Sequence, residues 1–307
     1  MARLGIDHPL VLVRDIEATA ARYRSLGFNT APTGFHPWGT STSLIVLERS
    51  ALEIMGIYDE ALLDGHAIGD FRFGRHMADA LAEREGVSLV ALYSEDAPGD
   101  RARLEAQGIP AQGRVDFRRR VKVPGRDWDE AVVTLEILVD PSLPRASNFL
   151  AQQHKPELVW VPEWMSHPNG ALGFAGITYA APDPAPVVAR LRRLFGDDAV
   201  RQTAEGHQAV TGKGTITVVP PGTWGRELGV DGEPDIGPAS AACIGIDVAV
   251  RDLPTLAGLL REAGTRTAET PGGIAVSDFK AFGNVLLRFV ASPTAPAGKT
   301  LATSSGN

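Results

Sequence analysis

The chain has 307 residues, of which 44% are hydrophobic and 22% are charged, a composition typical of a soluble globular protein rather than a disordered or fibrous one. Thirty Lys and Arg against 37 Asp and Glu give a net charge of −7, which disfavours nucleic acid and anionic lipid as partners. No apolar run reaches the roughly 18 residues that a membrane-spanning helix needs, and the N-terminus lacks the features of a signal peptide. The single cysteine, Cys243, excludes an internal disulfide and a cysteine-built zinc site, so a cytoplasmic location is expected.

Four predicted helices of similar length recur along the chain. Each begins after an aspartate that can cap the first turn, encloses apolar residues at helical spacing, and ends at a glycine about 12 residues later. The four segments run from Asp15 to Gly27, from Asp96 to Gly108, from Asp183 to Gly196 and from Asp252 to Gly264. This repeat predicts four structural units of the same kind.

A β-like apolar stretch precedes each predicted helix, at residues 9–13, 87–92, 174–179 and 244–250. Further strands follow the first helix at 28–31, 43–47 and 52–56, and the second helix at 115–123 and 131–139. Because these strands are joined by short turns rather than by more helices, an α+β fold is favoured over a doubly wound parallel sheet. Each unit is predicted as a βαβββ module.

The modules suggest a division of the chain into two pairs. Residues 1–140 form the first pair, and residues 173–291 form the second. Residues 141–172 contain five prolines and two tryptophans and are predicted as a connector, while 292–307 are expected to be a mobile tail. Residues 57–86, which include a short predicted helix with Met77 and Leu81, connect the first two modules.

Three residues on predicted strands are the main candidates for chemistry. His8 begins an apolar strand, Glu53 lies between Leu52 and Ile54, and Glu136 repeats that context at the equivalent point of the second module. All three could have purely structural roles, His8 as a hydrogen-bonded residue of its strand and the two glutamates as residues of edge strands. Converging in one cavity, one imidazole and two carboxylates would instead suit Fe, Mn, Ni, Co or Zn and leave positions open for substrate.

The chain resembles the vicinal oxygen chelate superfamily, in particular glyoxalase-like domain proteins. The resemblance is carried by the segments 6–8, 14–15, 26–28, 36–40 and 164–171, which read Ile-Asp-His, Arg-Asp, Leu-Gly-Phe, His-Pro-Trp-Gly-Thr and Trp-Met-Ser-His-Pro-Asn-Gly-Ala. It implies that paired βαβββ modules form cup-shaped sheets, with a divalent metal held by residues from the first and last strands of each module. The implied ligands are His8, Glu53 and Glu136.

The chain departs from the pattern of this superfamily at several positions. The first-strand ligand of the second module falls on Leu89 or Ser88 rather than on His or Gln, so water or His154 would complete the metal shell. In the third and fourth modules the matching positions fall on Gly176, Thr217, Gly245 and Arg288. The second half is therefore expected to carry no metal site, which argues against a close match to two-domain extradiol dioxygenases.

Two histidines lie in turns whose proline and glycine alone would explain the local sequence. These are His36, in His36-Pro37-Trp38-Gly39, and His167, in His167-Pro168-Asn169-Gly170. If either reaches the cavity, it would serve as a general base or a substrate donor. We expect His36, together with Glu53, in the catalytic role and His167 in substrate binding.

Other residues are candidates for the walls or the rim of the pocket. Trp38 and Met55 would line an apolar pocket, although either would equally serve as a packing residue, and His154 would lie at the rim. Arg118, Arg120 and Lys122 share one strand face, which is either solvated or lines the cup. In the second case Arg120 would favour a carboxylate-bearing or enolate-forming substrate.

The leading functional hypothesis is a divalent-metal enzyme of the glyoxalase-like kind, with lyase or isomerase chemistry on a small substrate that presents neighbouring oxygens. Two alternatives remain open: an Fe(II) ring-cleaving dioxygenase, and a metal-free protein that sequesters a small molecule in the same cup. All three name a small molecule as the partner, and the sequence leaves a homodimer open.

Overall fold

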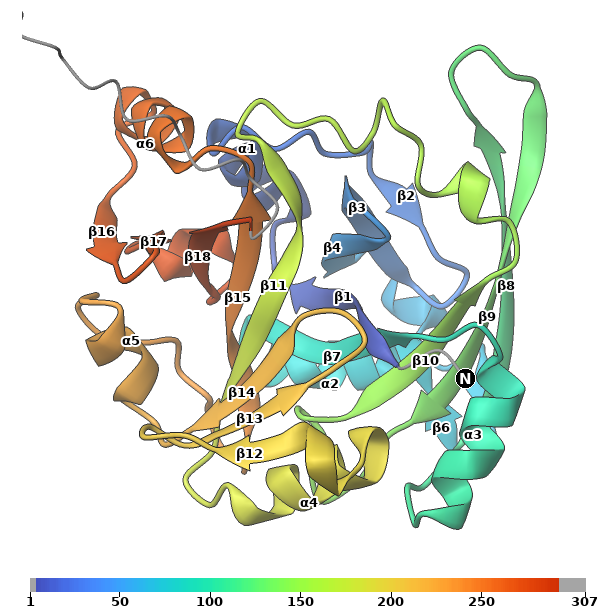
Figure 1. The fold of residues 1–307 in the computed structure, drawn as a ribbon. Helices are drawn as coiled ribbons and strands as arrows, with labels where there is room; N and C mark the ends of the chain where they lie inside the picture. Colours follow the sequence, from blue (N-terminus) through green and yellow to red (C-terminus); the bar gives the residue numbers. More distant parts are fainter. Residues whose placement is uncertain (1–3, 293–307) are drawn as a thin grey trace, which may run out of the picture.

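The computed structural model describes residues 4–292, which form four consecutive units of one strand, one helix and three further strands (Figure 1). The first unit comprises β1 (Gly5–Leu12), α1 (Ile16–Ser25), β2 (Gly34–Phe35), β3 (Thr40–Leu47) and β4 (Ser50–Ile57). The second comprises β7 (Gly86–Tyr93), α3 (Ala97–Ala106), β8 (Gly113–Lys122), β9 (Trp128–Leu138) and β10 (Asn148–Gln153).

The second half of the chain repeats this arrangement. The third unit comprises β11 (Ala171–Ala180), α4 (Ala185–Phe195), β12 (Val200–Gln202), β13 (His207–Val210) and β14 (Thr215–Val219). The fourth comprises β15 (Ala242–Val250), α6 (Leu253–Glu262), β16 (Thr267–Thr270), β17 (Gly273–Val276) and β18 (Leu286–Ala291). Between the units lie β5 (Ala67–Ile68), β6 (Phe71–Arg72), α2 (Phe73–Glu83), α5 (Thr223–Glu227) and the short 3-10 turns η1 (Glu60–Leu62) and η2 (Pro156–Leu158). Two further 3-10 turns lie within units: η3 (Asp197–Ala199) in the third and η4 (Phe279–Phe282) in the fourth.

Each pair of units makes one curved eight-stranded sheet. The strand order is β2-β3-β4-β1-β7-β10-β9-β8 in the first sheet and β12-β13-β14-β11-β15-β18-β17-β16 in the second. The first strands of the paired units run antiparallel at the centre of each sheet, and each pairs in parallel with the last strand of its own unit. The predicted α+β fold of four βαβββ modules in two cup-shaped sheets is confirmed.

The helix boundaries coincide with the predicted capping residues. Asp15, Asp96 and Asp252 are N-caps whose carboxylates accept the backbone N–H three residues later, at 2.9, 3.1 and 3.2 Å. Asp183 lies one residue before its helix cap and accepts the N–H of Ala185 at 3.0 Å. The glycines predicted to end the helices all adopt positive φ, which a residue without Cβ adopts at little cost: Gly27, Gly108, Gly196 and Gly264.

The segment predicted as a connector, 141–172, contains an interior strand of the first sheet. β10 lies between β7 and β9, and its residues Phe149, Leu150 and Ala151 are buried. The surrounding prolines and tryptophans obscure this short apolar run in the sequence. The second unit therefore extends beyond residue 140 and ends at β10 rather than at β9. The predicted mobile tail, 292–307, lies outside the described residues except for Ser292.

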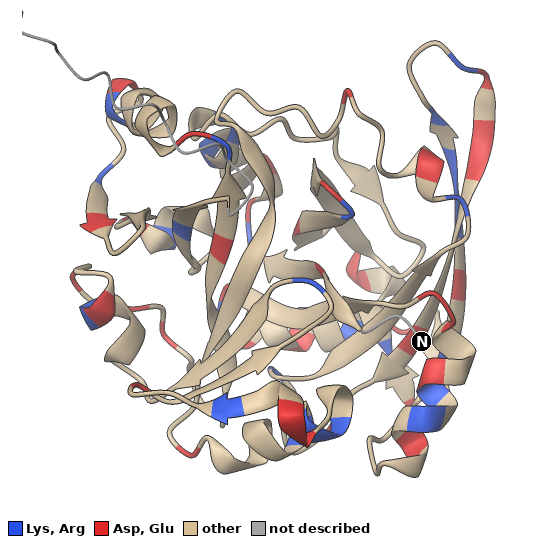
Figure 2. Ribbon diagram, in the orientation of Figure 1, with Lys and Arg blue, Asp and Glu red and all other residues tan. Residues whose placement is uncertain are grey.

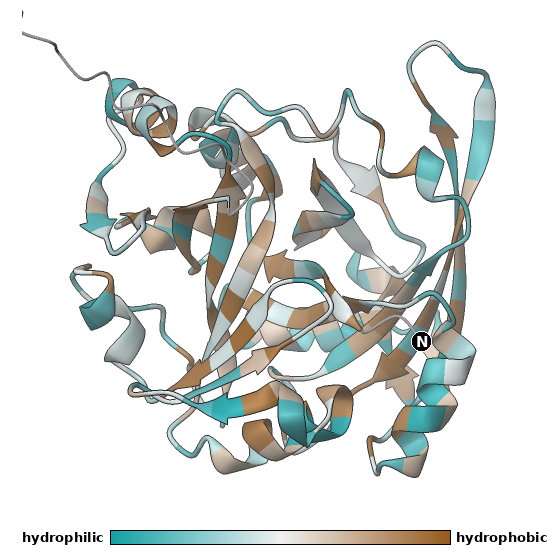
Figure 3. Cartoon of the chain, viewed as in Figure 1, coloured by the Kyte–Doolittle hydropathy of each residue, from teal (hydrophilic) through white to brown (hydrophobic). Residues whose placement is uncertain are grey.

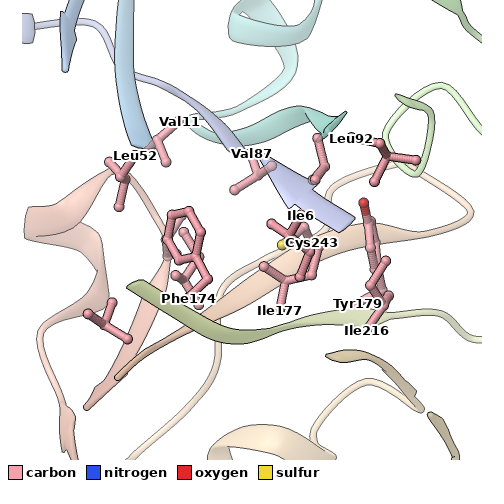
Figure 4. Close-up of a cluster of buried hydrophobic side chains, with 14 of the residues drawn as sticks. Ile6, Val11, Leu52, Val87, Leu92, Phe174, Ile177, Tyr179, Ile216 and Cys243 are labelled. Carbon is pink, nitrogen blue, oxygen red and sulfur yellow. The ribbon is translucent and has the colours of Figure 1, made fainter. Parts of the chain in front are cut away.

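The main hydrophobic core lies between the two sheets and takes side chains from both halves of the chain (Figure 4). Ile6 and Leu52 come from the first half, and Ile177 and Cys243 from the second. Cys243 is fully buried, and this burial raises the pKa of its thiol to about 12. The cysteine is therefore an apolar core residue, as the sequence predicts.

A second apolar cluster covers the opposite face of the first sheet. Leu10 and Met55 belong to it, whereas their neighbours Val11 and Ile54 point into the core between the sheets. This alternation is the ordinary consequence of strand geometry, in which successive side chains point to opposite faces. Figure 3 shows apolar residues concentrated along the central strands, with polar residues on the helices.

Charged residues lie mostly on the helices and on the hairpin of β8 and β9. Positive and negative residues are mixed on these elements, so they form no patch of a single charge (Figure 2). In residues 4–292, no helix is long and apolar enough to cross a membrane.

Candidate active site

A cavity of about 320 Å³ opens on the face of the first sheet that carries the second apolar cluster. Residues of both units line it, from β1, β3 and β4 on one side and from β8, β9 and β10 on the other. Most of its wall is apolar and includes Leu10, Trp38, Met55, Phe73, Phe117, Leu135 and Phe149. A small group of titratable side chains interrupts this wall at one place, the arrangement expected of a small-molecule site.

His8 is the central member of this polar group. Its Nδ1 lies 2.6 Å from Oδ1 of Asp7, and its Nε2 lies 3.4 Å from Oε2 of Glu53. The ring also meets Phe149 edge to face, with 5.5 Å between the ring centroids. Burial alone would lower the pKa of His8, but the hydrogen bond to Asp7 and the charges of Asp7 and Glu53 together raise it. The imidazolium form is thus stabilised between two carboxylates.

Glu53 points into the cavity because it shares a face of β4 with Ala51 and Met55. It is only 7% exposed, and its Oε1 accepts a 2.7 Å hydrogen bond from the hydroxyl of Thr42 on the neighbouring strand. The same oxygen lies 3.9 Å from Nε2 of His36. The carboxylate therefore stands between two imidazoles.

His36 reaches the cavity from the turn between β2 and β3. Its Nδ1 lies 2.8 Å from the hydroxyl of Thr40, and its ring stacks on Trp38 with 4.9 Å between centroids. Burial lowers the pKa of His36, with Arg119 and His8 acting in the same direction and Glu53 opposing them. The neutral form is therefore favoured, in contrast to His8.

Glu136, the third predicted ligand, does not lie in this cavity. On β9 the odd-numbered residues Val133 and Leu135 line the cavity, and Glu136 points to the other face of the sheet. There it lies beneath α3, with its Oε2 3.3 Å from Nη1 of Arg101. Burial raises the pKa of Glu136, and Arg101 opposes that shift. The structure thus brings together His8 and Glu53 but not Glu136.

The register of the strands explains this difference. In the first unit, Glu53 pairs with the residue two positions after His8. In the second unit, Phe149 pairs with the residue two positions after Leu89. Leu89 and Phe149 therefore occupy the ligand positions of the second unit, and both are apolar. Glu136 belongs to the penultimate strand, where the alternation of side chains directs it away from the cup.

The expected metal ligands do not fit a metal ion in this arrangement. Among the residues that the structure describes, no group of three or more His, Cys, Asp or Glu side chains is placed to hold one. Asp7 bonds to His8 rather than pointing freely into the cavity, and the second unit offers only carbon atoms at the matching positions.

Two other predicted histidines also lie outside the cavity. Nε2 of His154 lies 2.8 Å from the hydroxyl of Thr134, on the outer face of the sheet. His167 is buried, and its Nδ1 accepts the backbone N–H of Asn29 at 3.0 Å while its Nε2 lies 2.8 Å from the carbonyl oxygen of Val46. Burial lowers the pKa of His167. These hydrogen bonds join the segment before β11 to the first unit, and His167 does not line the cavity.

The basic residues of β8 divide between its two faces. Arg118 pairs with Glu130 at 2.8 Å on the outer face. Arg120 borders the cavity, with its guanidinium 4.9 Å from the ring centroid of Trp128, and Lys122 lies 6.0 Å from the same ring. The residue that lines the cavity beside Phe117 is Arg119, which the sequence analysis did not single out. The sequence indicated this orientation, because strand alternation places residues 117 and 119 on the face opposite to Arg118.

In the second half, a partly buried ion pair occupies the corresponding region. Arg288 donates to both carboxylate oxygens of Asp247, at 2.8 and 2.6 Å, and its guanidinium lies 4.6 Å from the ring centroid of Trp224. Burial raises the pKa of Asp247, and Arg288 opposes that shift. The side chains that fill this cup serve packing and charge pairing.

Comparison with known proteins gives one family and several similar structures. The model of the glyoxalase-like domain matches residues 6–195, a range that contains every residue lining the cavity. No curated protein matches the chain in sequence. A hypothetical protein from Staphylococcus aureus aligns with a TM-score of 0.66 at 10% identity, covering 94% of this chain and 100% of its own.

Two further structures share the fold. A mutant of 4-hydroxymandelate synthase from Streptomyces coelicolor aligns with a TM-score of 0.53 at 13% identity, covering 97% of this chain and 95% of its own. The Mn(II)-bound glyoxalase from Novosphingobium aromaticivorans aligns with a TM-score of 0.51 at 10% identity, covering 95% and 83%. At these identities the similarity extends to the fold alone.

Proposed function

We propose, since this chain belongs to the glyoxalase-like domain family, that the cavity of its first sheet is the active site of a proton-transfer enzyme. The substrate would be a small molecule with an apolar body and a carbonyl or hydroxyl group. The reaction would be an isomerisation or an elimination next to that oxygen. The observation that carries the proposal is the meeting of His8, Glu53 and His36 in a cavity that is otherwise apolar.

Each of the three residues has a distinct role in this proposal. His36, which is favoured in its neutral form, takes a proton from the carbon next to the substrate carbonyl through Nε2. His8, held as the cation by its two carboxylates, donates toward the oxygen on which negative charge develops. Glu53 orients both rings. The proton then returns to the neighbouring carbon in an isomerisation, or a leaving group departs in an elimination.

The metal-dependent hypothesis is less well supported by these residues. It requires Glu136 beside His8 and Glu53, but Glu136 pairs with Arg101 on the far face of the sheet. The Fe(II) ring-cleaving alternative depends on the same ligands. The proposal therefore assigns the proton transfers to side chains of this chain.

The test is solvent deuterium incorporation, which needs no knowledge of the product. A panel of aryl ketones and aryl-substituted 2-oxo acids is incubated in D2O with the wild type, and loss of the proton next to the carbonyl is followed by NMR. His36→Gln should slow the exchange at least about a hundredfold. The matched control, His154→Gln, should exchange at the wild-type rate because His154 lies on the outer face. Equal rates for the wild type and His36→Gln would refute the proposal.

A metal-free binding function is the second candidate. The specific observation in its favour is the pair of apolar residues, Leu89 and Phe149, at the ligand positions of the second unit. The same experiment separates the two candidates. A protein that binds members of the panel but leaves their protons unexchanged is a binding protein.

A further inference from the structure

Arg119 is the one guanidinium on the inner face of β8 beside the aromatic wall of the cavity. It pairs with Ala131 on β9. Phe117, two residues earlier on β8, and its own pairing partner Val133 also line the cavity. Phe117 in turn contacts His36, with 5.4 Å between ring centroids, and Trp38, with 5.5 Å. Arg119 therefore belongs to the same wall as the proposed catalytic residues.

Arg114 and Arg118, on the outer face of β8, have carboxylate partners, and Arg119 does not. Arg120, which borders the cavity, also lacks a carboxylate partner, and its guanidinium lies over the ring of Trp128. Arg118 pairs with Glu130 at 2.8 Å, and Arg114 pairs with Asp116 at 2.8 Å. Within residues 4–292, no hydrogen-bond acceptor and no carboxylate lies within bonding distance of the Arg119 guanidinium. Its five N–H donors are thus left to a ligand or to water in the cavity.

The charge of Glu53 does not neutralise Arg119 by direct contact. Burial lowers the pKa of Arg119, and the negative charge of Glu53 raises it. The Glu53 carboxylate already has Thr42, His8 and His36 around it. A substrate that extends from the polar group along the wall formed by β8 would therefore meet the Arg119 guanidinium, which has no carboxylate partner, with Arg120 beside it.

Resting on the proposed function, we infer that the substrate is an aromatic or similarly flat molecule with a carboxylate at the end remote from its reacting oxygen, and that Arg119 binds this carboxylate. A planar guanidinium matches a carboxylate with two parallel hydrogen bonds. A single arginine suits a carboxylate monoanion better than a phosphate dianion. The volume of about 320 Å³ is at the small end for ligand pockets and is suited to one ring with short substituents.

The binding test compares 4-acetylbenzoate with its neutral amide, 4-acetylbenzamide, by isothermal titration calorimetry. The wild type should bind the acid at least about tenfold more tightly than the amide, because a charge-assisted pair is lost in the amide. Arg119→Met should weaken acid binding by about the same factor and leave amide binding unchanged. Arg118→Met is the matched control, from the next residue on the outer face, and should change neither affinity.

Three results would overturn the inference. They are equal affinities of the wild type for acid and amide, no detectable binding of either, and an unchanged preference for the acid in Arg119→Met. Failure of the proposed function gives a different pattern, in which the acid preference persists and depends on Arg119 while the bound ketone exchanges no protons. His36→Gln should retain the acid preference and lose only the exchange.

Discussion

The two glutamates predicted as ligands give the sharpest single comparison, Glu53→Gln against Glu136→Gln. Glu53 lies between two imidazoles at 3.4 and 3.9 Å, and its charge raises the pKa of His8. Replacing it by glutamine keeps the size of the side chain but removes the charge that orients and polarises both rings. Impairing the general acid–base pair that Glu53 orients corresponds to a rate reduction of about 10² to 10⁴.

Glu136→Gln should behave differently, because Glu136 is separated from the cavity by the sheet itself. The amide can still accept a hydrogen bond from Arg101, and removal of a buried charge offsets part of the lost ion pair. The expected change in the free energy of unfolding is about 1 kcal/mol or less, with wild-type exchange rates. Deuterium incorporation and urea denaturation on both variants provide the two measurements. A folded Glu136→Gln protein without activity would refute the assignment of the site.

Two further predictions follow from the histidines. Activity should depend on pH as a bell: it rises as His36 loses its proton, with a pKa below the usual 6.5, and falls as His8 loses its proton, with a pKa above 6.5, because the first acts as a base and the second as a cation. The pH dependence of the exchange rate would show this, and His8→Gln should remove the falling limb. His167→Ala should cost about 2 to 5 kcal/mol of unfolding free energy in urea titrations, because the backbone groups of Asn29 and Val46 each lose a buried partner. The exchange activity of folded His167→Ala should remain; loss of activity at unchanged stability would restore its predicted role in substrate binding.

The architecture could be predicted because it is encoded locally. Aspartate caps and terminal glycines fix the four helices, and short apolar stretches beside them fix the strands. Two residues of the proposed catalytic group, His8 and Glu53, could be predicted from their strand positions within the first unit. The position of His36 in a turn could also be predicted, but the sequence did not decide between a purely structural turn and a histidine that reaches the cavity.

The predicted equivalence of Glu136 with Glu53 was wrong because one strand was not recognised in the sequence. β10 is six residues long and lies within a segment rich in proline and tryptophan, so the preceding strand was taken as the last of its unit. The face to which a side chain points depends on strand pairing as well as on alternation. When β9 is taken as the last strand in place of β10, Glu136 is wrongly matched with Glu53. Arg119 was missed for a related reason. Alternation separates it from Arg118, but only the pairing of β8 with β9 decides which face turns toward the cavity.

The measurement that tests the central claim most directly is deuterium incorporation by wild-type protein dialysed exhaustively against a chelator and checked for residual metal by elemental analysis. Because His36 and His8, oriented by Glu53, are proposed to move the protons themselves, the metal-depleted protein should exchange the protons of 4-acetylbenzoate at the rate of the untreated protein. Exchange that disappears on dialysis and returns when a divalent ion is added would contradict the account.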